Sequence, residues 1–371
     1  MTATRRQLYI LCIWSLLAVA MALSPAGADD IDWNRARQLY QMEQNGQTLS
    51  PDDEAYLQRA KQARASKAQQ PAQAPRDQTG LVPLTDLTGD YHGEDGGLYG
   101  KSRNEPPPEV AAAAKAQSAK IQPLDAQGNP SPDGKIVLLS IGMSNTTAEF
   151  STFITLAGAD LAKSPKVILV DGAQGGQTAD KIASTEGVLF WQIIEQRLKA
   201  AGVTPQQVQV VWLKEAIARP SAGFPTEMTK LKNSLIDDVH IAVGRYPNLR
   251  IAYLSSRIYG GYATTLLNPE PYAYESAFAD RWAIEAQMSG DASLNFDPSK
   301  GAVKAPLLLW GPYLWADGIK GRKVDGLVWN REDFGPDGTH PSRTSGCQKV
   351  AQLLLNFFKT DPYAPLWFVG K

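Results

Sequence analysis

Five short apolar runs between residues 136 and 310, separated by longer amphipathic segments, place the tightest limit on the fold. The runs are Ile136–Leu139, Val167–Val170, Val208–Trp212, Ile251–Leu254 and Leu307–Trp310. Helical stretches lie between them near residues 148–163, 185–200, 226–246 and 272–289, and another amphipathic stretch follows the last run. Short continuous apolar strands that alternate with helices are typical of a parallel sheet covered on both faces. The pattern therefore predicts an α/β fold, a three-layer α/β/α sandwich around a five-stranded parallel sheet.

In such a fold the functional side chains are expected at the carboxyl ends of the strands. Ser144 follows the first run, within Gly142-Met143-Ser144-Asn145. Asp337 and His340 stand together directly before the last amphipathic stretch, within Asp337-Gly-Thr-His340-Pro-Ser342. Gly338 and Pro341 disfavour a helix across this second segment, so we predict a turn there. Folding would bring the two segments together as a Ser-His-Asp triad.

The chemistry of this triad follows from the three side chains. A serine hydroxyl is a poor nucleophile until a base removes its proton. His340 would accept that proton and return it to the leaving group, while Asp337 would hold the imidazole tautomer. The chain has only two other histidines: His240 lies in a predicted helix beside acidic residues, and His92 lies in a glycine-rich segment. His340 is therefore the candidate base.

The two segments resemble sequence blocks of the SGNH (GDSL-like) hydrolase superfamily, over roughly residues 131–360. Gly142-Met143-Ser144-Asn145 is similar to the Gly-Gln-Ser-Asn form of sialate O-acetylesterase-like carbohydrate esterases, and residues 337–342 are similar to the last block. The resemblance implies a flavodoxin-like sandwich. It also implies Ser144 as the nucleophile, His340 as the base and Asp337 as the orienting acid.

The same resemblance implies an oxyanion hole. The family's second block supplies a glycine N–H, and Gly176, after the second apolar run, is the better match of the two glycines there. The third block normally supplies an asparagine, which this chain lacks; Lys214 stands in its place and is the expected donor. The alternative for Lys214 is a stem packed on Trp212 with the charge in solvent or on a local acid. Asn145 either donates to the substrate or braces the Ser144 turn.

Four further residues are candidates for binding the substrate. Arg257 and Tyr262 follow the fourth apolar run, and Trp310 and Tyr313 lie at and after the end of the fifth. Arg257 would bind an acidic group of a substrate, or pair with a local acid. Tyr262 would form a sugar-stacking wall or cap the core, and Trp310 with Tyr313 would form an aromatic pocket wall or simply pack.

Residues 1–28 are typical of a secretory signal peptide. Arg5 and Arg6 precede an apolar stretch at residues 8–23, and Ala26-Gly27-Ala28 is a cleavage site of the A-x-A type. An uncleaved anchor is the alternative. Cleavage would remove Cys12 and leave Cys347 alone, which excludes an intramolecular disulfide. We therefore expect a periplasmic or extracellular protein with no stable membrane span after cleavage.

The region between the signal and the sheet divides into two parts. Residues 29–66 predict a helical hairpin, broken at Asn45-Gly46 and restarted by Ser50 as an N-cap. Residues 67–130 predict a linker and a glycine-rich loop, and residues 131–371 the hydrolase-like domain. The loop at residues 89–100 contains acids and His92, which leaves a metal loop, a substrate-side loop or a surface loop open. Its spacing matches no metal motif, so we predict no metal and no organic cofactor.

Charge limits the class of partner. The chain has 37 basic and 38 acidic residues, so its net charge does not favour binding to nucleic acid.

The sequence predicts a secreted serine esterase that hydrolyses a small-molecule or polysaccharide ester, with an O-acetylated carbohydrate as the expected class. Two alternatives are a lipase or thioesterase-like enzyme for longer acyl chains and a non-catalytic surface or binding protein that keeps the fold.

Overall fold

The computed structural model describes residues 31–44, 49–68 and 74–370, which belong to two units, Met1–Gln69 and Gln70–Lys371. The predicted signal peptide, Cys12 and Asn45-Gly46 lie outside the described residues. Within the described part of the chain, no helix has both the length and the apolar character needed to cross a membrane.

The first unit contains a helical hairpin of α1 (Trp33–Gln44) and α2 (Pro51–Ala68), as predicted. Ser50 caps α2, since its Oγ accepts a hydrogen bond from the Asp53 amide at 3.2 Å. Arg35 of α1 pairs with the Asp53 carboxylate at 2.9 Å, and buried Leu39 and Leu57 belong to the two helices. The capping signal at Ser50 and the apolar spacing in α1 thus produce the local structure that each predicts.

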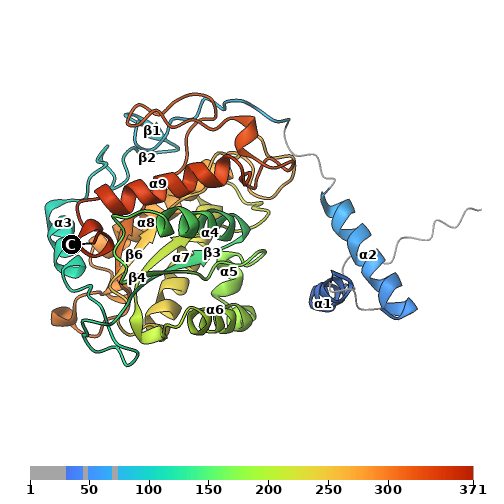
Figure 1. The fold of residues 1–371 in the computed structure, drawn as a ribbon. Helices are drawn as coiled ribbons and strands as arrows, with labels where there is room; N and C mark the ends of the chain where they lie inside the picture. Colours follow the sequence, from blue (N-terminus) through green and yellow to red (C-terminus); the bar gives the residue numbers. More distant parts are fainter. Residues whose placement is uncertain (1–30, 45–48, 69–73, 371) are drawn as a thin grey trace, which may run out of the picture. The chain divides into compact units, whose positions relative to one another are not determined.

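The second unit contains a five-stranded sheet whose strands all run parallel (Figure 1). The strands are β3 (Ile136–Gly142), β4 (Val167–Asp171), β5 (Val208–Lys214), β6 (Ile251–Leu254) and β7 (Leu307–Trp310). Their spatial order is β4-β3-β5-β6-β7. This confirms the predicted three-layer α/β fold, and it is the flavodoxin-like strand order. The strand order reverses at β3, where a doubly wound sheet opens a crevice at its carboxyl edge.

Helices cover both faces of this sheet. Right-handed crossovers place α4 on one face and the helices between β4 and β7 on the other. α4 packs beside α9, and α7 packs beside α8 (Figure 1). The helices of this unit are α3 (Pro108–Ser118), α4 (Ser144–Gly158), α5 (Ala179–Ile182), α6 (Val188–Ala200), α7 (Thr226–Arg245), α8 (Tyr272–Met288), α9 (Gly346–Thr360) and α10 (Pro365–Phe368). Short 3₁₀ turns lie at residues 185–187, 205–207, 292–294, 298–300 and 331–333.

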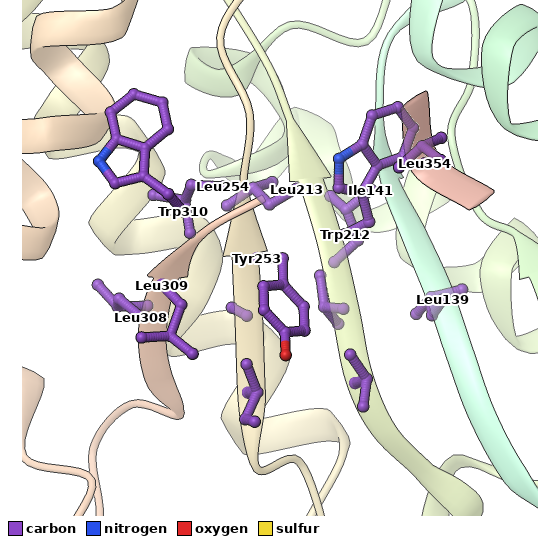
Figure 2. Packing of buried hydrophobic residues seen from close by; sticks show 14 of the residues in the cluster. Leu139, Ile141, Trp212, Leu213, Tyr253, Leu254, Leu308, Leu309, Trp310 and Leu354 are labelled. Carbon is purple, nitrogen blue, oxygen red and sulfur yellow. The ribbon is translucent and has the colours of Figure 1, made fainter. Parts of the chain in front are cut away.

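The core consists of apolar side chains from the strands and from the helices that cover them (Figure 2). Every residue of β3 and β5 is buried, as expected for strands covered on both faces. On the α4 face, Phe150 stacks on Trp212 with ring centroids 5.7 Å apart, and Phe153 contacts Phe358 of α9. These contacts hold the start of α4 against the sheet next to the carboxyl end of β3.

α4 begins earlier than the sequence predicts. We expected a helix near residues 148–163, whereas the structure begins it at Ser144 and ends it at Gly158. Ser, Asn and Thr are weak helix formers because their side chains compete with the backbone for hydrogen bonds. Here tertiary partners remove that competition: Thr146 Oγ1 donates to the Lys214 carbonyl at 2.7 Å, and Thr147 donates to the Asp171 carboxylate.

Residues 74–130, predicted as linker and loop, belong to the second unit and are bonded to its other elements. The hairpin of β1 (Asp90–Tyr91) and β2 (Glu94–Asp95) is held by Arg281 of α8, which pairs with Glu94 at 2.6 Å and with Asp95 at 3.1 Å. Further upstream, buried Asp317 accepts hydrogen bonds from the amides of residues 79 and 80. The composition of residues 74–130 does not reveal these ion pairs and backbone hydrogen bonds, because their partners are distant in the sequence. A segment with linker-like composition is therefore part of the folded domain.

Candidate active site

Ser144 is the first residue of α4, two residues after the end of β3. Gly142 makes this sharp strand-to-helix junction possible, because a Cβ on it would lie 2.3 Å from Thr146 Oγ1 and 2.4 Å from the Lys214 carbonyl. The first amides of a helix have no carbonyl partner within the helix, and the helix dipole is positive at this end. Ser144 therefore stands where negative charge on an attacking or developing oxygen is stabilised.

Asp337 and His340 lie on a turn, as the sequence predicts, at the far end of the second unit's sequence. Gly338 adopts the left-handed backbone region at φ 65°, and a Cβ there would lie 1.8 Å from the Tyr262 carbonyl oxygen. The Thr264 amide donates to the Asp337 carbonyl at 2.9 Å, and Gly335 donates to the His340 carbonyl at 2.8 Å. These contacts seat residues 335–340, hereafter the catalytic turn, against the loop that follows β6.

The structure brings Ser144, His340 and Asp337 into one hydrogen-bonded chain. Ser144 Oγ is 2.7 Å from His340 Nε2, and His340 Nδ1 is 2.5 Å from Asp337 Oδ2. The other Asp337 oxygen accepts the amides of Thr339 and His340 at 3.1 and 3.0 Å. Burial raises the pKa of Asp337, but the hydrogen bonds from His340 and from these amides outweigh it and lower the pKa to about 2. Asp337 is therefore a carboxylate that orients the imidazole.

Gly175 and Gly176 form a turn beside the serine. The Gln177 amide closes the turn on the Gln174 carbonyl at 3.3 Å, and Gly176 has φ 74°. A Cβ on Gly175 would lie 3.8 Å from the Ser144 Cβ, so this glycine is the immediate neighbour of the serine. Neither glycine amide has an acceptor within the described chain. The predicted donor Gly176 thus lies in the turn that flanks Ser144.

Lys214 does not occupy the position that we predicted for it. Its ammonium group donates to both oxygens of Glu149, at 2.8 and 2.6 Å, and the two side chains are 1 % and 0 % exposed. Burial lowers the pKa of Lys214, and the charge of Glu149 opposes that shift. An ammonium group already engaged by a buried carboxylate is not free to bind an oxyanion. The expected role as an oxyanion donor is therefore corrected to that of a buried ion-pair partner on the α4 side of β5.

Asn145 and Arg257 are both buried beside the catalytic turn. Asn145 Nδ2 donates to the Thr339 carbonyl at 2.9 Å, which is a bracing contact of the kind given as one of its two alternatives. Arg257 Nη2 lies 3.5 Å from the same carbonyl. Burial lowers the pKa of Arg257, while Glu149 and Glu215 oppose the shift. No described carboxylate is close enough to form an ion pair with Arg257, so the local acid pair that was one alternative is absent from the described residues.

The side chains of the three predicted aromatic residues are buried, and their hydrogen bonds run to backbone groups outside the triad. Tyr262 Oη donates to the Trp329 carbonyl at 3.3 Å, and burial raises its pKa to about 12. Trp310 Nε1 donates to the Leu98 carbonyl at 2.5 Å, and the Tyr313 hydroxyl accepts the Leu84 amide. Trp310 and Tyr313 line a cavity of about 340 Å³ to which no triad residue contributes. The predicted aromatic wall is therefore separate from the triad.

Two features of the site were not found by sequence reasoning. Glu149 lies in α4 without a motif around it, and only its position five residues after Ser144 would have placed it near the sheet. The Thr339 carbonyl, a backbone group, carries no sequence signal at all. Among the described residues, no group of three or more His, Cys, Asp or Glu side chains is placed to hold a metal ion. The acids at residues 94 and 95 pair instead with Arg281.

No protein-family model matches the chain, and no curated protein sequence matches it. Among solved structures it is similar to a lipase from a goat rumen metagenome, with 16% identity, 62% of this chain and 100% of the other covered, and a TM-score of 0.34. A carbohydrate esterase family 3 protein from Talaromyces cellulolyticus shares 13% identity, with 59% and 93% covered and a TM-score of 0.30. The periplasmic domain of a lipopolysaccharide acetyltransferase from Salmonella Paratyphi A shares 14% identity, with 67% and 96% covered and a TM-score of 0.32.

Proposed function

We propose that this chain is a serine ester hydrolase that acts through an acyl-serine intermediate. The observation that carries the proposal is the hydrogen-bonded chain from Ser144 through His340 to Asp337, with distances of 2.7 and 2.5 Å. Such a chain at a strand-to-helix junction is what an activated serine requires. It is difficult to explain by stability alone, since all three side chains are only partly buried.

The reaction would proceed in two steps. In the first, His340 Nε2 takes the Ser144 proton as Oγ attacks the ester carbonyl, and then gives that proton to the departing alcohol. In the second, His340 takes a proton from water, the hydroxide attacks the acyl-serine carbonyl, and the proton returns to Ser144 as the acid leaves. Asp337 stabilises the imidazolium in both steps. Amides at Ser144 and in the Gly175-Gly176 turn would donate to the oxyanion; one such donor contributes on the order of 3 kcal/mol.

For the substrate we propose an O-acyl ester, in the first place an O-acetyl ester of a carbohydrate. The support is the resemblance of Gly142-Met-Ser144-Asn145 to the first block of sialate O-acetylesterase-like enzymes, together with the signal-like residues 1–28, which support an exported protein. The SGNH assignment rests on the same motif. A series of p-nitrophenyl esters of increasing acyl length tests the class, since acetyl preference supports the proposal and preference for long chains supports a lipase-like enzyme.

Labelling with a fluorophosphonate, followed by peptide mapping, tests the nucleophile. We expect modification of Ser144 alone and no modification of Ser144→Ala. Ser151→Ala is the matched control, because Ser151 lies in the same helix with its hydroxyl bonded to the Ala148 carbonyl. Modification of a different serine, or no reaction of the wild-type protein with both the probe and the ester series, would refute the proposal.

A further inference from the structure

The Thr339 carbonyl oxygen receives side-chain donors from two elements that are far apart in the sequence. Asn145, in the first turn of α4, donates at 2.9 Å, and Arg257, in the loop after β6, lies at 3.5 Å. Thr339 directly precedes His340, and Asn145 directly follows Ser144. The Asn145–Thr339 bond therefore runs beside the 2.7 Å contact between Ser144 and His340 and joins the same two segments.

Both side chains that reach this carbonyl are buried. Asn145 is 2 % exposed and Arg257 is 3 % exposed. Arg257 Nε has no hydrogen-bond partner within the described chain, and Nη2 finds only the Thr339 oxygen. Burying an amide or a guanidinium is costly unless the group is hydrogen-bonded. The unpaired Arg257 Nε therefore carries an energetic cost in the folded state. A role for Arg257 beside this carbonyl would explain why a buried arginine stands there.

The catalytic turn has little regular structure of its own to hold it. It sits in a loop between a 3₁₀ turn at residues 331–333 and α9 (Gly346–Thr360). Arg331 of that 3₁₀ turn donates to the carbonyls of residues 335 and 336, and the Thr264 amide in the loop after β6 donates to the Asp337 carbonyl. Besides the contact between Ser144 and His340, Asn145 provides a direct hydrogen bond from this turn to α4. The hydrogen bond from Asn145 fixes the position of the catalytic turn relative to the start of α4. A contact between the turn and the loop after β6 cannot do this alone.

We propose that Asn145 and Arg257 are positioning residues, which hold the catalytic turn so that His340 Nε2 stays within hydrogen-bond distance of Ser144 before substrate arrives. The proposal rests on the esterase function proposed above and assigns Asn145 a role outside the oxyanion hole. Neither side chain would touch the substrate. Misplacement of a reacting group by about 1 Å costs about a hundredfold in rate.

Kinetics of Asn145→Ala and Arg257→Met test this assignment, and methionine keeps the buried stem of the arginine. We expect kcat for a short-chain ester to fall by about tenfold to a hundredfold in each variant with KM within about twofold. Asn248→Ala is the matched control, since Asn248 Nδ2 also donates to a backbone carbonyl, that of Gln206 at 2.8 Å, near the amino ends of the strands. Its kcat should match that of the wild-type protein. Unchanged kcat in both Asn145→Ala and Arg257→Met would overturn the proposal.

A double variant separates positioning from direct participation. If Asn145 acts only through His340, then adding Asn145→Ala to His340→Ala should not lower the residual rate further. An additional loss of tenfold or more would show that Asn145 stabilises the oxyanion itself, and would overturn the proposal. Thermal unfolding of each variant, compared with Asn248→Ala, shows whether a loss of kcat follows a general loss of structure.

A spectroscopic measurement tests the geometry without turnover. The proton between His340 Nδ1 and Asp337 should give a far-downfield proton resonance, which His340→Ala identifies by removing it. We expect Asn145→Ala and Asn145→Asp to broaden or shift this resonance, while Asn248→Ala leaves it in place. An identical resonance in all three variants would overturn the positioning role. The wild-type protein could show the resonance but neither hydrolyse esters nor react with fluorophosphonate. In that case the esterase proposal fails, and the comparison of the resonance between the wild type and the Asn145 variants alone decides the positioning role.

Discussion

Lys214 and Glu149 form an ion pair in the interior of the sandwich, with Nζ and Oε2 2.6 Å apart and almost no exposed surface on either side chain. The pair joins the carboxyl end of β5 to α4, the helix that begins with Ser144. Removing one partner of a buried ion pair leaves an uncompensated charge, whereas replacing both by apolar side chains is often neutral. The pair therefore links the stability of the domain to the placement of α4, which begins with Ser144.

Lys214→Ala should lower the free energy of unfolding by about 3–5 kcal/mol, because Glu149 would remain buried without its partner. Chemical denaturation monitored by circular dichroism measures this loss. The double variant Lys214→Met with Glu149→Leu should recover most of it. A stable Lys214→Ala protein with a large loss of kcat would instead return Lys214 to the oxyanion hole.

Triad variants should not behave independently. Ser144→Ala and His340→Ala should each remove nearly all esterase activity, and the double variant should be little worse, since the two residues act on one proton. Asp337→Asn should lower kcat less completely, since the imidazole remains but in a poorer tautomer. Initial rates with a short-chain p-nitrophenyl ester measure all four proteins. Losses that multiply across the three positions would show that no shared mechanism exists.

Activity should rise with pH in a single step on the acid side. The base must be neutral to accept the Ser144 proton, and Asp337, whose pKa is lowered to about 2, stays ionised throughout. The stability of the folded state should also rise with pH. Because the pKa of Asp337 is lower in the folded state, its ionisation stabilises the fold above the ordinary pKa of an aspartate, and this contribution is lost as the pH falls toward 2. A kcat/KM profile and acid unfolding curves for wild type and Asp337→Asn measure both. A second acid-side step in kcat/KM, or an unfolding curve unchanged by Asp337→Asn, would contradict this account.

Gly338→Ala should displace the catalytic turn. The added Cβ would lie 1.8 Å from the Tyr262 carbonyl oxygen, and alanine at φ 65° carries backbone strain of about 1–3 kcal/mol. We expect a large fall in fluorophosphonate reactivity. Gly335→Ala in the same turn is the control, since its Cβ would meet the His340 carbonyl oxygen at an ordinary 3.6 Å. Equal reactivity of the two variants would show that these contacts do not hold the turn.

Local sequence alone determined much of the architecture. Continuous apolar runs such as Ile136–Leu139 predict buried parallel strands, because only a strand covered on both faces lacks polar residues. The glycines and prolines around Asp337 and His340 predict a turn for steric reasons that need no knowledge of the rest of the chain. Because the carboxyl ends of parallel strands meet at one edge, the order of strands and motifs in the sequence also predicts that Ser144 and the Gly175-Gly176 segment lie together.

Tertiary structure decided what each side chain at that edge does. Lys214 looks like an exposed polar residue at a strand end, yet the buried carboxylate of Glu149 engages it, and that partner lies 65 residues away. Asn145 follows Ser144 in the sequence, but its amide nitrogen donates to the Thr339 carbonyl, a backbone group that no side-chain pattern reveals. Trp310 is the last residue of β7 and Tyr313 follows that strand, and both line a cavity to which no triad residue contributes. Periodicity records which residues are buried, whereas the partner of a buried polar group depends on how distant segments meet.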